Sequence, residues 1–243
     1  MSGTLTYSFN YNSDEELMKH LIKWTEILNK TENDNEVMEE IDITNPDYFD
    51  IEPILNHKCT LVHSSSIVMD QQYKFAQLIL SKVKERKEAN ERLFVIDNSI
   101  KSEQVNWESF NVDQVVYTNK EGFNLLNGIE LHPEYKITII IMDYNSLYLE
   151  DESAFEIALD GLIHTENVSI IAFCGNFEGV LLPEDLESAF TLRIVFNTLQ
   201  PEYSKNLIGT EDGYYLQDNN FIMYDTKTNV KQLYLWNGLT ITE

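Results

Sequence analysis

From residue 59 onward the chain carries eight short apolar runs, and this pattern constrains its fold more than any other feature. The runs span residues 59–62, 93–96, 115–117, 137–142, 168–173, 193–196, 221–224 and 232–235. Several are almost continuously hydrophobic, as strands buried on both faces of a parallel sheet are. Stretches with apolar residues at helical spacing, at 71–88, 153–164 and 183–190, separate some of them. The alternation predicts an α/β fold with a mainly parallel sheet, and the last two runs predict a terminal antiparallel hairpin.

The first forty residues have a different pattern. A capping box, in which Glu16 follows Ser13 by three residues, predicts a helix to about Asn29. Its apolar stripe is Leu17, Leu21, Trp24 and Leu28. An acidic linker follows at 30–40, and residues 42–53 are expected to be extended with a turn. We therefore predict an N-terminal helix and linker at 1–40, packed on the core, and one α/β domain at 41–243.

The charge of the chain limits its partners. It has 41 acidic and 17 basic residues and a net charge of -24. Nucleic-acid-binding proteins need basic surface to replace phosphate counterions, so we expect no nucleic-acid partner. No apolar run approaches the roughly 20 residues of a membrane-spanning helix, so we expect no direct membrane insertion. Cys59 and Cys174 lie in apolar runs and are predicted to be buried reduced thiols, which fits a cytoplasmic setting.

Ligands of open α/β sheets bind at the carboxyl ends of the strands, so the stretch after the first run is the first candidate site. A phosphate-binding loop here would have the pattern G-x-x-x-x-G-K-[ST]. Its four fixed positions are occupied by His63, Val68, Met69 and Asp70. Val at a position that needs a positive φ costs roughly 1–2 kcal/mol. Met cannot make the charged hydrogen bond to phosphate, and Asp adds a repelling carboxylate. We expect tight Mg·ATP binding to be lost.

Three serines in this loop leave two alternatives open. They could hold a weakly bound anion at a helix N-terminus, or they could only cap the helix. The degenerate loop as predicted comprises His63, Ser64, Ser65, Ser66, Ile67, Val68, Met69 and Asp70.

The second candidate is the strand at 137–142 and the residues that follow it. In an ATPase, such a strand has four apolar residues followed by two acids. The first acid binds Mg²⁺, and the second is the catalytic base that activates water. Only one acid, Asp143, is present. Either Asp143 takes the magnesium position and Tyr144 replaces the base, or Met142 replaces the magnesium ligand and Asp143 stands for the base. We prefer the second alignment, and in both half of the acid pair is missing.

Two other strand ends are weaker candidates. Asp97 follows the run at 93–96 and is expected to cap the next turn, and Cys174 stands where a polar residue would be expected. The five histidines have no metal-ligand spacing, so no metal site is predicted. A Cys174–His164 thiol pair is disfavoured because nothing orients the histidine. An unrelated α/β enzyme with clustered acids over the strand ends remains a further alternative.

The order and spacing of these segments resemble the FtsK/SpoIIIE-like ATPase domains. More narrowly, they resemble the C-terminal ATPase domain of the EssC/EccC coupling proteins of type VII secretion systems. The segments that carry the resemblance are 41–43, 50–54, 59–70, 93–97, 139–147, 170–172, 189–196, 204–209 and 216–224. The resemblance implies a RecA-like P-loop NTPase core with a mainly parallel twisted sheet flanked by helices. The departures fall on the nucleotide chemistry, whereas the strands and Arg193 are kept.

The resemblance also implies a function. Such proteins are membrane-anchored hexameric motors with tandem ATPase domains on the cytoplasmic face, and they recruit WXG100-type secreted proteins. We expect a non-hydrolysing domain that engages or regulates substrates beside the other ATPase domains of its parent chain. ATP and Mg²⁺ are the cofactors of the family, and their binding is expected to be weak or absent here. The alternative is a weak ATPase, or one completed in trans by a neighbouring domain.

Overall fold

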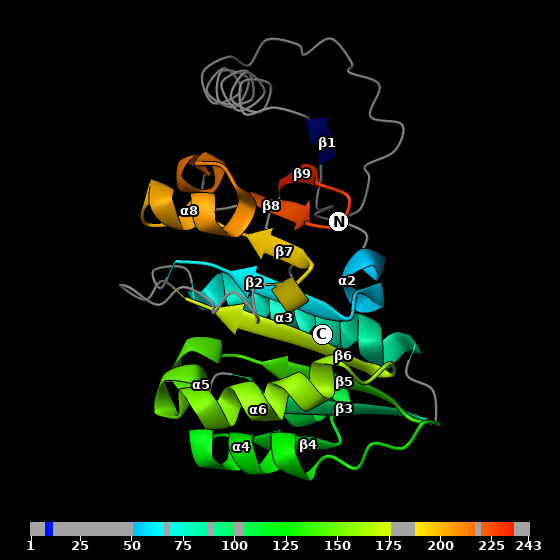
Figure 1. The fold of residues 1–243 in the computed structure, drawn as a ribbon. Helices are drawn as coiled ribbons and strands as arrows, with labels where there is room; N and C mark the ends of the chain where they lie inside the picture. Colours follow the sequence, from blue (N-terminus) through cyan, green and yellow to red (C-terminus); the bar gives the residue numbers. More distant parts are fainter. Residues whose placement is uncertain are drawn as a thin grey trace.

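A mixed sheet forms the centre of the molecule. The computed structural model describes residues 8–11, 51–65, 69–86, 90–99, 105–175, 188–216 and 220–235. Within them the strands form one sheet in the order β1-β9-β8-β7-β2-β6-β5-β3-β4 (Figure 1). The strands are β1 (Ser8–Tyr11), β2 (Cys59–His63), β3 (Glu91–Ile96), β4 (Gln114–Val116), β5 (Lys136–Ile141), β6 (Val168–Cys174), β7 (Leu192–Val195), β8 (Asn220–Asp225) and β9 (Val230–Leu235).

The direction of the strands confirms the predicted fold class. β2, β3, β4, β5, β6 and β7 run parallel to their neighbours within that group, and β7–β8, β8–β9 and β9–β1 are antiparallel. All eight apolar runs are strands, with ends that differ by one or two residues. The terminal hairpin is β8–β9. The sequence did not predict β1, which adds an edge strand to β9.

Helices cover the sheet on both sides. They are α2 (Glu52–Asn56), α3 (Met69–Arg86), α4 (Asn119–Gly128), α5 (Tyr144–Glu150), α6 (Glu152–Ile163) and α8 (Pro201–Ile208), with 3₁₀ turns η3 (Trp107–Phe110) and η4 (Asp212–Tyr215). The predicted helices at 71–88 and 153–164 are α3 and α6. Most of the one predicted at 183–190 lies outside the described residues.

Four helices were not predicted, namely α2, α4, α5 and α8. The extended segment predicted to reach Pro53 is wrong at its end, because α2 begins at Glu52. Proline is compatible with the first turn of a helix, since its missing N–H has no partner there anyway. α4 has few apolar residues but is capped by the Thr118 side chain, which accepts the N–H of Glu121.

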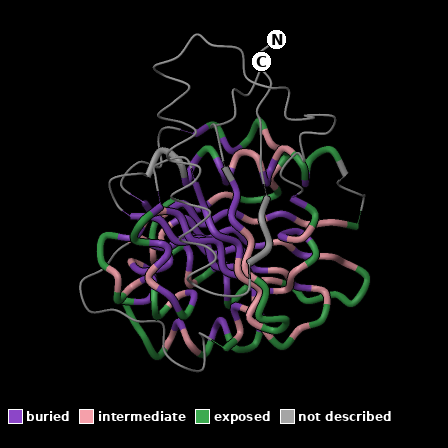
Figure 2. The backbone as a smooth tube through the Cα atoms, turned by 90° about the horizontal axis from the view of Figure 1, so that it is seen from above, coloured by how far each residue is buried: buried purple, intermediate pink, exposed green. Residues whose placement is uncertain are grey.

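The strands bury both of their faces, as near-continuous apolar runs require. Val62 and Ile140 pack with Phe75 of α3 on one side. On the other side, the alternate residues Leu61 and Ile139 lie in one core with side chains of α4, α5 and α6. Figure 2 shows the buried backbone gathered in the sheet at the centre. A close approach of α4 to the sheet depends on Gly122, where a Cβ would lie 2.9 Å from Ile96 Cγ2.

The predicted N-terminal helix, the acidic linker and most of the extended segment fall in residues 12–50, outside the described residues. Residues 8–11 are the part of the predicted 1–40 unit that the structure describes, and they belong to the sheet. The division at residue 40 stays a prediction. Among the described residues, no helix is long and apolar enough to cross a membrane.

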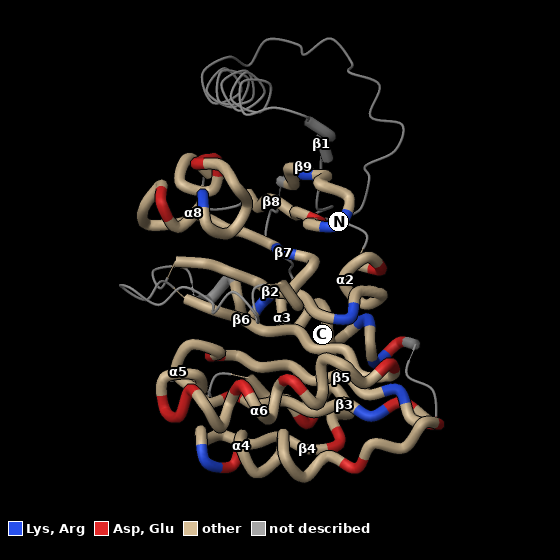
Figure 3. Tube along the Cα trace, in the orientation of Figure 1, with Lys and Arg blue, Asp and Glu red and all other residues tan. Residues whose placement is uncertain are grey.

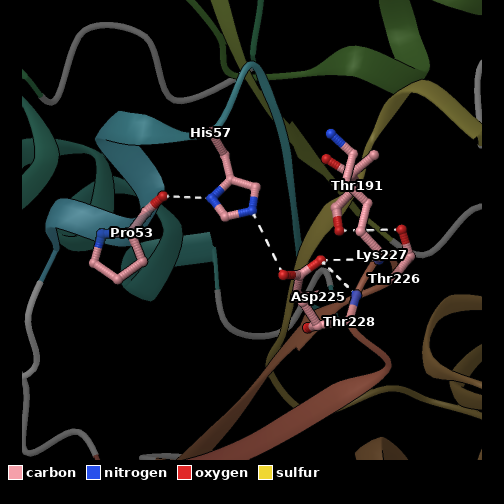
Figure 4. Close-up of polar contacts among 7 residues, drawn as sticks. All are labelled: Pro53, His57, Thr191, Asp225, Thr226, Lys227 and Thr228. Carbon is pink, nitrogen blue, oxygen red and sulfur yellow. Dashed lines mark hydrogen bonds and ion pairs between the residues drawn. The ribbon is translucent and has the colours of Figure 1, made fainter.

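An ionic contact closes the amino-terminal end of the sheet (Figure 4). The His57 ring faces the Pro53 carbonyl through Nδ1 at 2.6 Å and Asp225 Oδ2 through Nε2 at 4.0 Å. Asp225 Oδ1 also accepts the N–H groups of Lys227, at 2.9 Å, and Thr228. Burial alone would raise the pKa of Asp225, but these hydrogen bonds and His57 lower it below its usual value. The ionised carboxylate therefore stabilises the β8–β9 turn through hydrogen bonds and contacts His57, the residue that follows α2.

Candidate functional site

The carboxyl ends of the parallel strands meet at one edge of the sheet, where this kind of fold binds ligands. We call the described residues at this edge the strand-end rim. It consists of His63, Ser64 and Ser65 after β2, Asp97 and Asn98 after β3, Met142 and Asp143 after β5, and Cys174 of β6. The rim contains no Lys or Arg. Of the predicted loop, Ser66, Ile67 and Val68 lie outside the described residues, and Met69 and Asp70 form the start of α3.

The first residues of the predicted loop are bound to neighbouring strands. The Ser64 N–H donates to the Cys174 carbonyl at 3.1 Å, and the Ser65 N–H donates to the Asn197 carbonyl at 3.0 Å. Gln72 Nε2, in the first turn of α3, donates to the same Cys174 carbonyl at 2.9 Å. Both serines are buried. These two backbone amides are thus directed at protein carbonyls and are not available to a phosphate.

His63 and Cys174 pair beneath this loop. His63 Nδ1 lies 3.4 Å from Cys174 Sγ, and both residues are buried. Burial, together with the charge of Asp143, raises the pKa of the Cys174 thiol far above its usual value. The thiolate is the nucleophilic form of cysteine, so this pair is not an activated nucleophile. His164, the partner weighed from the sequence, instead lies at the end of α6 beside Asp160.

Both cysteines are buried free thiols, as predicted. Burial raises the pKa of Cys59 to about 11. The His63–Cys174 contact joins residues 111 positions apart and was not predicted.

The residues after β5 also serve the fold. Met142 is buried, and its N–H donates to the Ile96 carbonyl at 2.9 Å. Asp143 caps α5, because Oδ1 accepts the Ser146 N–H at 3.0 Å. The backbone of Asp143 exchanges two hydrogen bonds with the Asn98 side chain. Tyr144 packs edge-on against Phe155, at a centroid distance of 5.1 Å. Neither the methionine nor the buried tyrosine offers an oxygen to a metal at the rim.

The electrostatics of Asp143 disfavour its ionised form. Burial raises its pKa, the Ser146 hydrogen bond partly offsets this, and the charge of Asp97 adds to the rise. Mg²⁺ binds through oxygen ligands, with carboxylates as its protein partners. The ionised form of this carboxyl is disfavoured, methionine and tyrosine flank it in the sequence, and the described residues of the rim include no Lys or Arg, so this set of residues does not fit Mg·ATP. Among the described residues, no three His, Cys, Asp or Glu side chains lie together as a metal site requires.

Asp97 is the centre of a buried polar cluster. It has no exposed surface. Oδ1 accepts the hydroxyls of Tyr73, at 3.0 Å, and Ser99, at 2.9 Å, and Oδ2 accepts Trp107 Nε1 at 2.7 Å. The hydroxyl oxygens of Tyr73 and Ser99 also contact each other. Asp97 was expected only to cap a turn, but its described partners are side chains. It ties α3 and η3 to the end of β3.

Arg193, the basic residue that the resemblance keeps, points away from the rim. Its guanidinium donates to the Leu207 carbonyl at 2.8 Å and to the Asn206 carbonyl at 3.3 Å. These carbonyls lie in the last turn of α8, where a cation is favourable. Arg193 thereby joins β7 to α8.

Comparison with known proteins identifies the class of this fold. Neither a protein-family model nor a curated protein matches the sequence. Solved structures do match, and they are P-loop ATPases of the RecA-like kind. At their low sequence identities the likeness establishes the fold and no more.

The cytoplasmic domain of the type VII secretion ATPase EccC of Thermomonospora curvata matches with a TM-score of 0.59 at 12% identity, over 73% of this chain and 25% of that chain. The conjugation coupling protein TcpA of pCW3 matches with a TM-score of 0.57 at 12% identity, over 75% of this chain and 61% of that chain. The genome-packaging NTPase B204 of Sulfolobus turreted icosahedral virus 2 matches with a TM-score of 0.56 at 17% identity, over 74% of this chain and 98% of that chain. This chain therefore spans about a quarter of the EccC cytoplasmic domain and nearly all of the viral NTPase.

Proposed function

We propose that this chain is a non-hydrolysing, ATPase-like domain of a type VII secretion motor, which engages or regulates secreted protein substrates. One observation carries the proposal: on a P-loop ATPase fold, the Ser64 and Ser65 amides and the side chains of Asp97 and Asp143 at the strand-end rim are hydrogen-bonded to other groups of the protein, and the described rim residues include no Lys or Arg. The buried Ser64 and Ser65 amides, the capping role of Asp143 and the buried Met142 all support it.

The parent protein is proposed from the order of segments and from the EccC likeness. One EccC structure, of ATPases 2 and 3 in complex with a signal sequence peptide, matches with a TM-score of 0.50 at 13% identity, over 79% of this chain and 38% of that chain. By analogy, this chain would be the distal domain of a hexameric, membrane-anchored parent. Its partners would be the other ATPase domains and WXG100-type proteins, at the cytoplasmic face of the membrane.

A DNA-translocating role is the competing class, since TcpA is a conjugation protein and B204 a genome-packaging NTPase. The net charge of -24 argues against it. With 17 basic against 41 acidic residues, the chain has few cations to replace the phosphate counterions whose release drives binding to DNA. We therefore infer that the partner is a polypeptide.

Two experiments test the two halves of the proposal. Calorimetric titration of the chain with Mg·ATP is expected to show no binding, and micromolar affinity would contradict the nucleotide half. Pull-down of secreted substrate pairs by the parent protein is expected to fail when this domain is deleted. Undiminished capture would contradict the substrate half.

The alternative is an ATPase completed in trans, and it uses Asp143 as the remaining acid of the rim. It predicts turnover in the assembled parent that Asp143→Asn in this domain reduces. Turnover that is the same in the variant parent supports the non-hydrolysing role.

A further inference from the structure

A hollow lies away from the strand-end rim, along the outer side of α6. Its volume is about 540 Å³, and it is lined by Glu156, Ile157, Asp160, Ile163, His164, Ser188 and Ala189. We call it the α6 groove. Ile157 is 75% exposed, the largest exposed fraction among the large apolar side chains of the described residues. An isoleucine exposed to water beside a hollow gains free energy when a partner covers it, because its apolar surface is then removed from water.

The charge around the groove has one sign. Residues 137–192 contain eleven Asp or Glu and no Lys or Arg. Figure 3 shows acidic residues along α5 and α6 without a basic one. Among the described residues, Asp160 pairs with His164 at 3.3 Å, and both of these side chains are about three-quarters exposed. An exposed pair of this kind contributes little and is easily replaced by another cation.

A buried hydroxyl adjoins the same wall. Tyr144 lies beneath α6 against Phe155, and against Phe190, which follows the groove residue Ala189. Its hydroxyl has no hydrogen-bond partner among the described residues. Burial raises the Tyr144 pKa, with smaller contributions from Cys174, Tyr148 and, least, the groove residue Glu156. The groove thus combines an apolar anchor point, Ile157, with the carboxylates of Glu156 and Asp160, and it lies on the outer side of the helix that covers the Tyr144 hydroxyl.

We propose that the α6 groove binds a basic amphipathic segment of a partner polypeptide. An apolar side chain of the segment covers Ile157, and its Lys or Arg side chains face Glu156 and Asp160. Nucleic acid, anionic lipid and a second copy of this chain all carry the same sign of charge and are repelled. The polypeptide nature of the occupant rests on the proposed function, whereas the chemistry of the groove does not depend on nucleotide.

The test uses a labelled synthetic peptide with Lys and Leu at amphipathic helical spacing, and fluorescence anisotropy against the full chain without nucleotide. We expect saturable binding that weakens as ionic strength rises. A peptide with Glu in place of Lys is expected not to bind. Ile157→Ser and Asp160→Lys are each expected to weaken binding of the basic peptide about tenfold or more.

Matched variants elsewhere on the surface separate the groove from general attraction. Glu108→Lys makes the same kind of charge change on η3, which packs by α3 on the opposite side of the sheet, and Val230→Ser removes another exposed apolar side chain. Both are expected to leave the affinity within about twofold, with unchanged circular dichroism in every variant. Equal losses in Asp160→Lys and Glu108→Lys, or unchanged affinity in Ile157→Ser, would overturn the proposal.

The result is distinguishable from a failure of the proposed function. Peptide binding is measured without nucleotide, and the Mg·ATP titration without peptide. Nucleotide binding together with groove binding would contradict the non-hydrolysing role and keep the groove. If the chain bound neither nucleotide nor peptide, the non-hydrolysing role would be kept and the groove proposal would be overturned.

Discussion

The two ends of the sheet shift the pKa of a carboxyl group in opposite directions. At the carboxyl end, Asp143 lies in a desolvated rim beside a second acid, and its pKa is raised. At the amino end, Asp225 receives two backbone N–H groups and faces His57, and its pKa is lowered. Ligands of α/β sheets bind at the carboxyl end, yet the ionised form is disfavoured for Asp143 at that end and stabilised for Asp225 at the other end.

Under the proposed function, this difference shows how a P-loop ATPase fold can keep its strand ends without a nucleotide site at them. The polar groups of the rim form hydrogen bonds within the protein. Asp97 accepts from Tyr73 and Trp107, Asp143 caps α5, and the Cys174 carbonyl accepts from the turn that leads into α3. Exposed carboxylates lie instead along α6, in a stretch of sequence without Lys or Arg. Under the two proposals above, a partner binds at this outer surface and not at the strand ends.

The largest expected effect of a single substitution is at Asp97. Asp97→Ala leaves the buried donors of Tyr73, Ser99 and Trp107 without their acceptor. We expect a loss of about 3–5 kcal/mol in the free energy of unfolding, measured by urea denaturation. Trp107→Phe removes one donor and is expected to cost less. A loss under about 1 kcal/mol in Asp97→Ala would mean that the rim acid is free for another role.

A smaller effect is expected at the amino end of the sheet. Asp225→Asn weakens the charge-assisted hydrogen bonds and should cost about 1 kcal/mol at neutral pH. Because the pKa of Asp225 is lowered in the folded chain, its stabilisation is present above the usual carboxyl pKa and is lost as pH falls through the lowered value. Urea unfolding across acid pH checks this: the difference between wild type and variant should shrink as pH falls. A difference that grows would contradict the account.

The smallest effect, of opposite sign, is expected at Asp143. Because its pKa is raised in the folded chain, its contribution to stability is present at low pH and is lost as pH rises through the raised value. Asn is an equally good helix cap, so Asp143→Asn should be slightly more stable than wild type at neutral pH. The same pH series measures it. If Asp143→Asn and Asp225→Asn changed stability in the same direction at neutral pH, the contrast between the two ends would be wrong.

The strands could be predicted because burial on both faces leaves a near-continuous apolar run, as in β5 and β6. β1 could not, because four residues at the sheet edge carry no such run and are held by pairing with β9. The rim could be located from strand ends alone. The hydrogen bonds within the rim could not be predicted, because tertiary packing brings Tyr73 and Trp107 to Asp97. The absence of Lys and Arg from 137–192 is visible in the sequence, but the hollow beside Ile157 needed the structure.

The central claim is that this P-loop ATPase fold does not bind Mg·ATP, and a thermal melt with and without Mg·ATP tests it most directly. Ligand at 100 times its Kd stabilises a folded protein by about 2.7 kcal/mol. With millimolar Mg·ATP, we predict a melting temperature unchanged from that of the chain alone. A reproducible rise that depends on both Mg²⁺ and ATP would contradict the account.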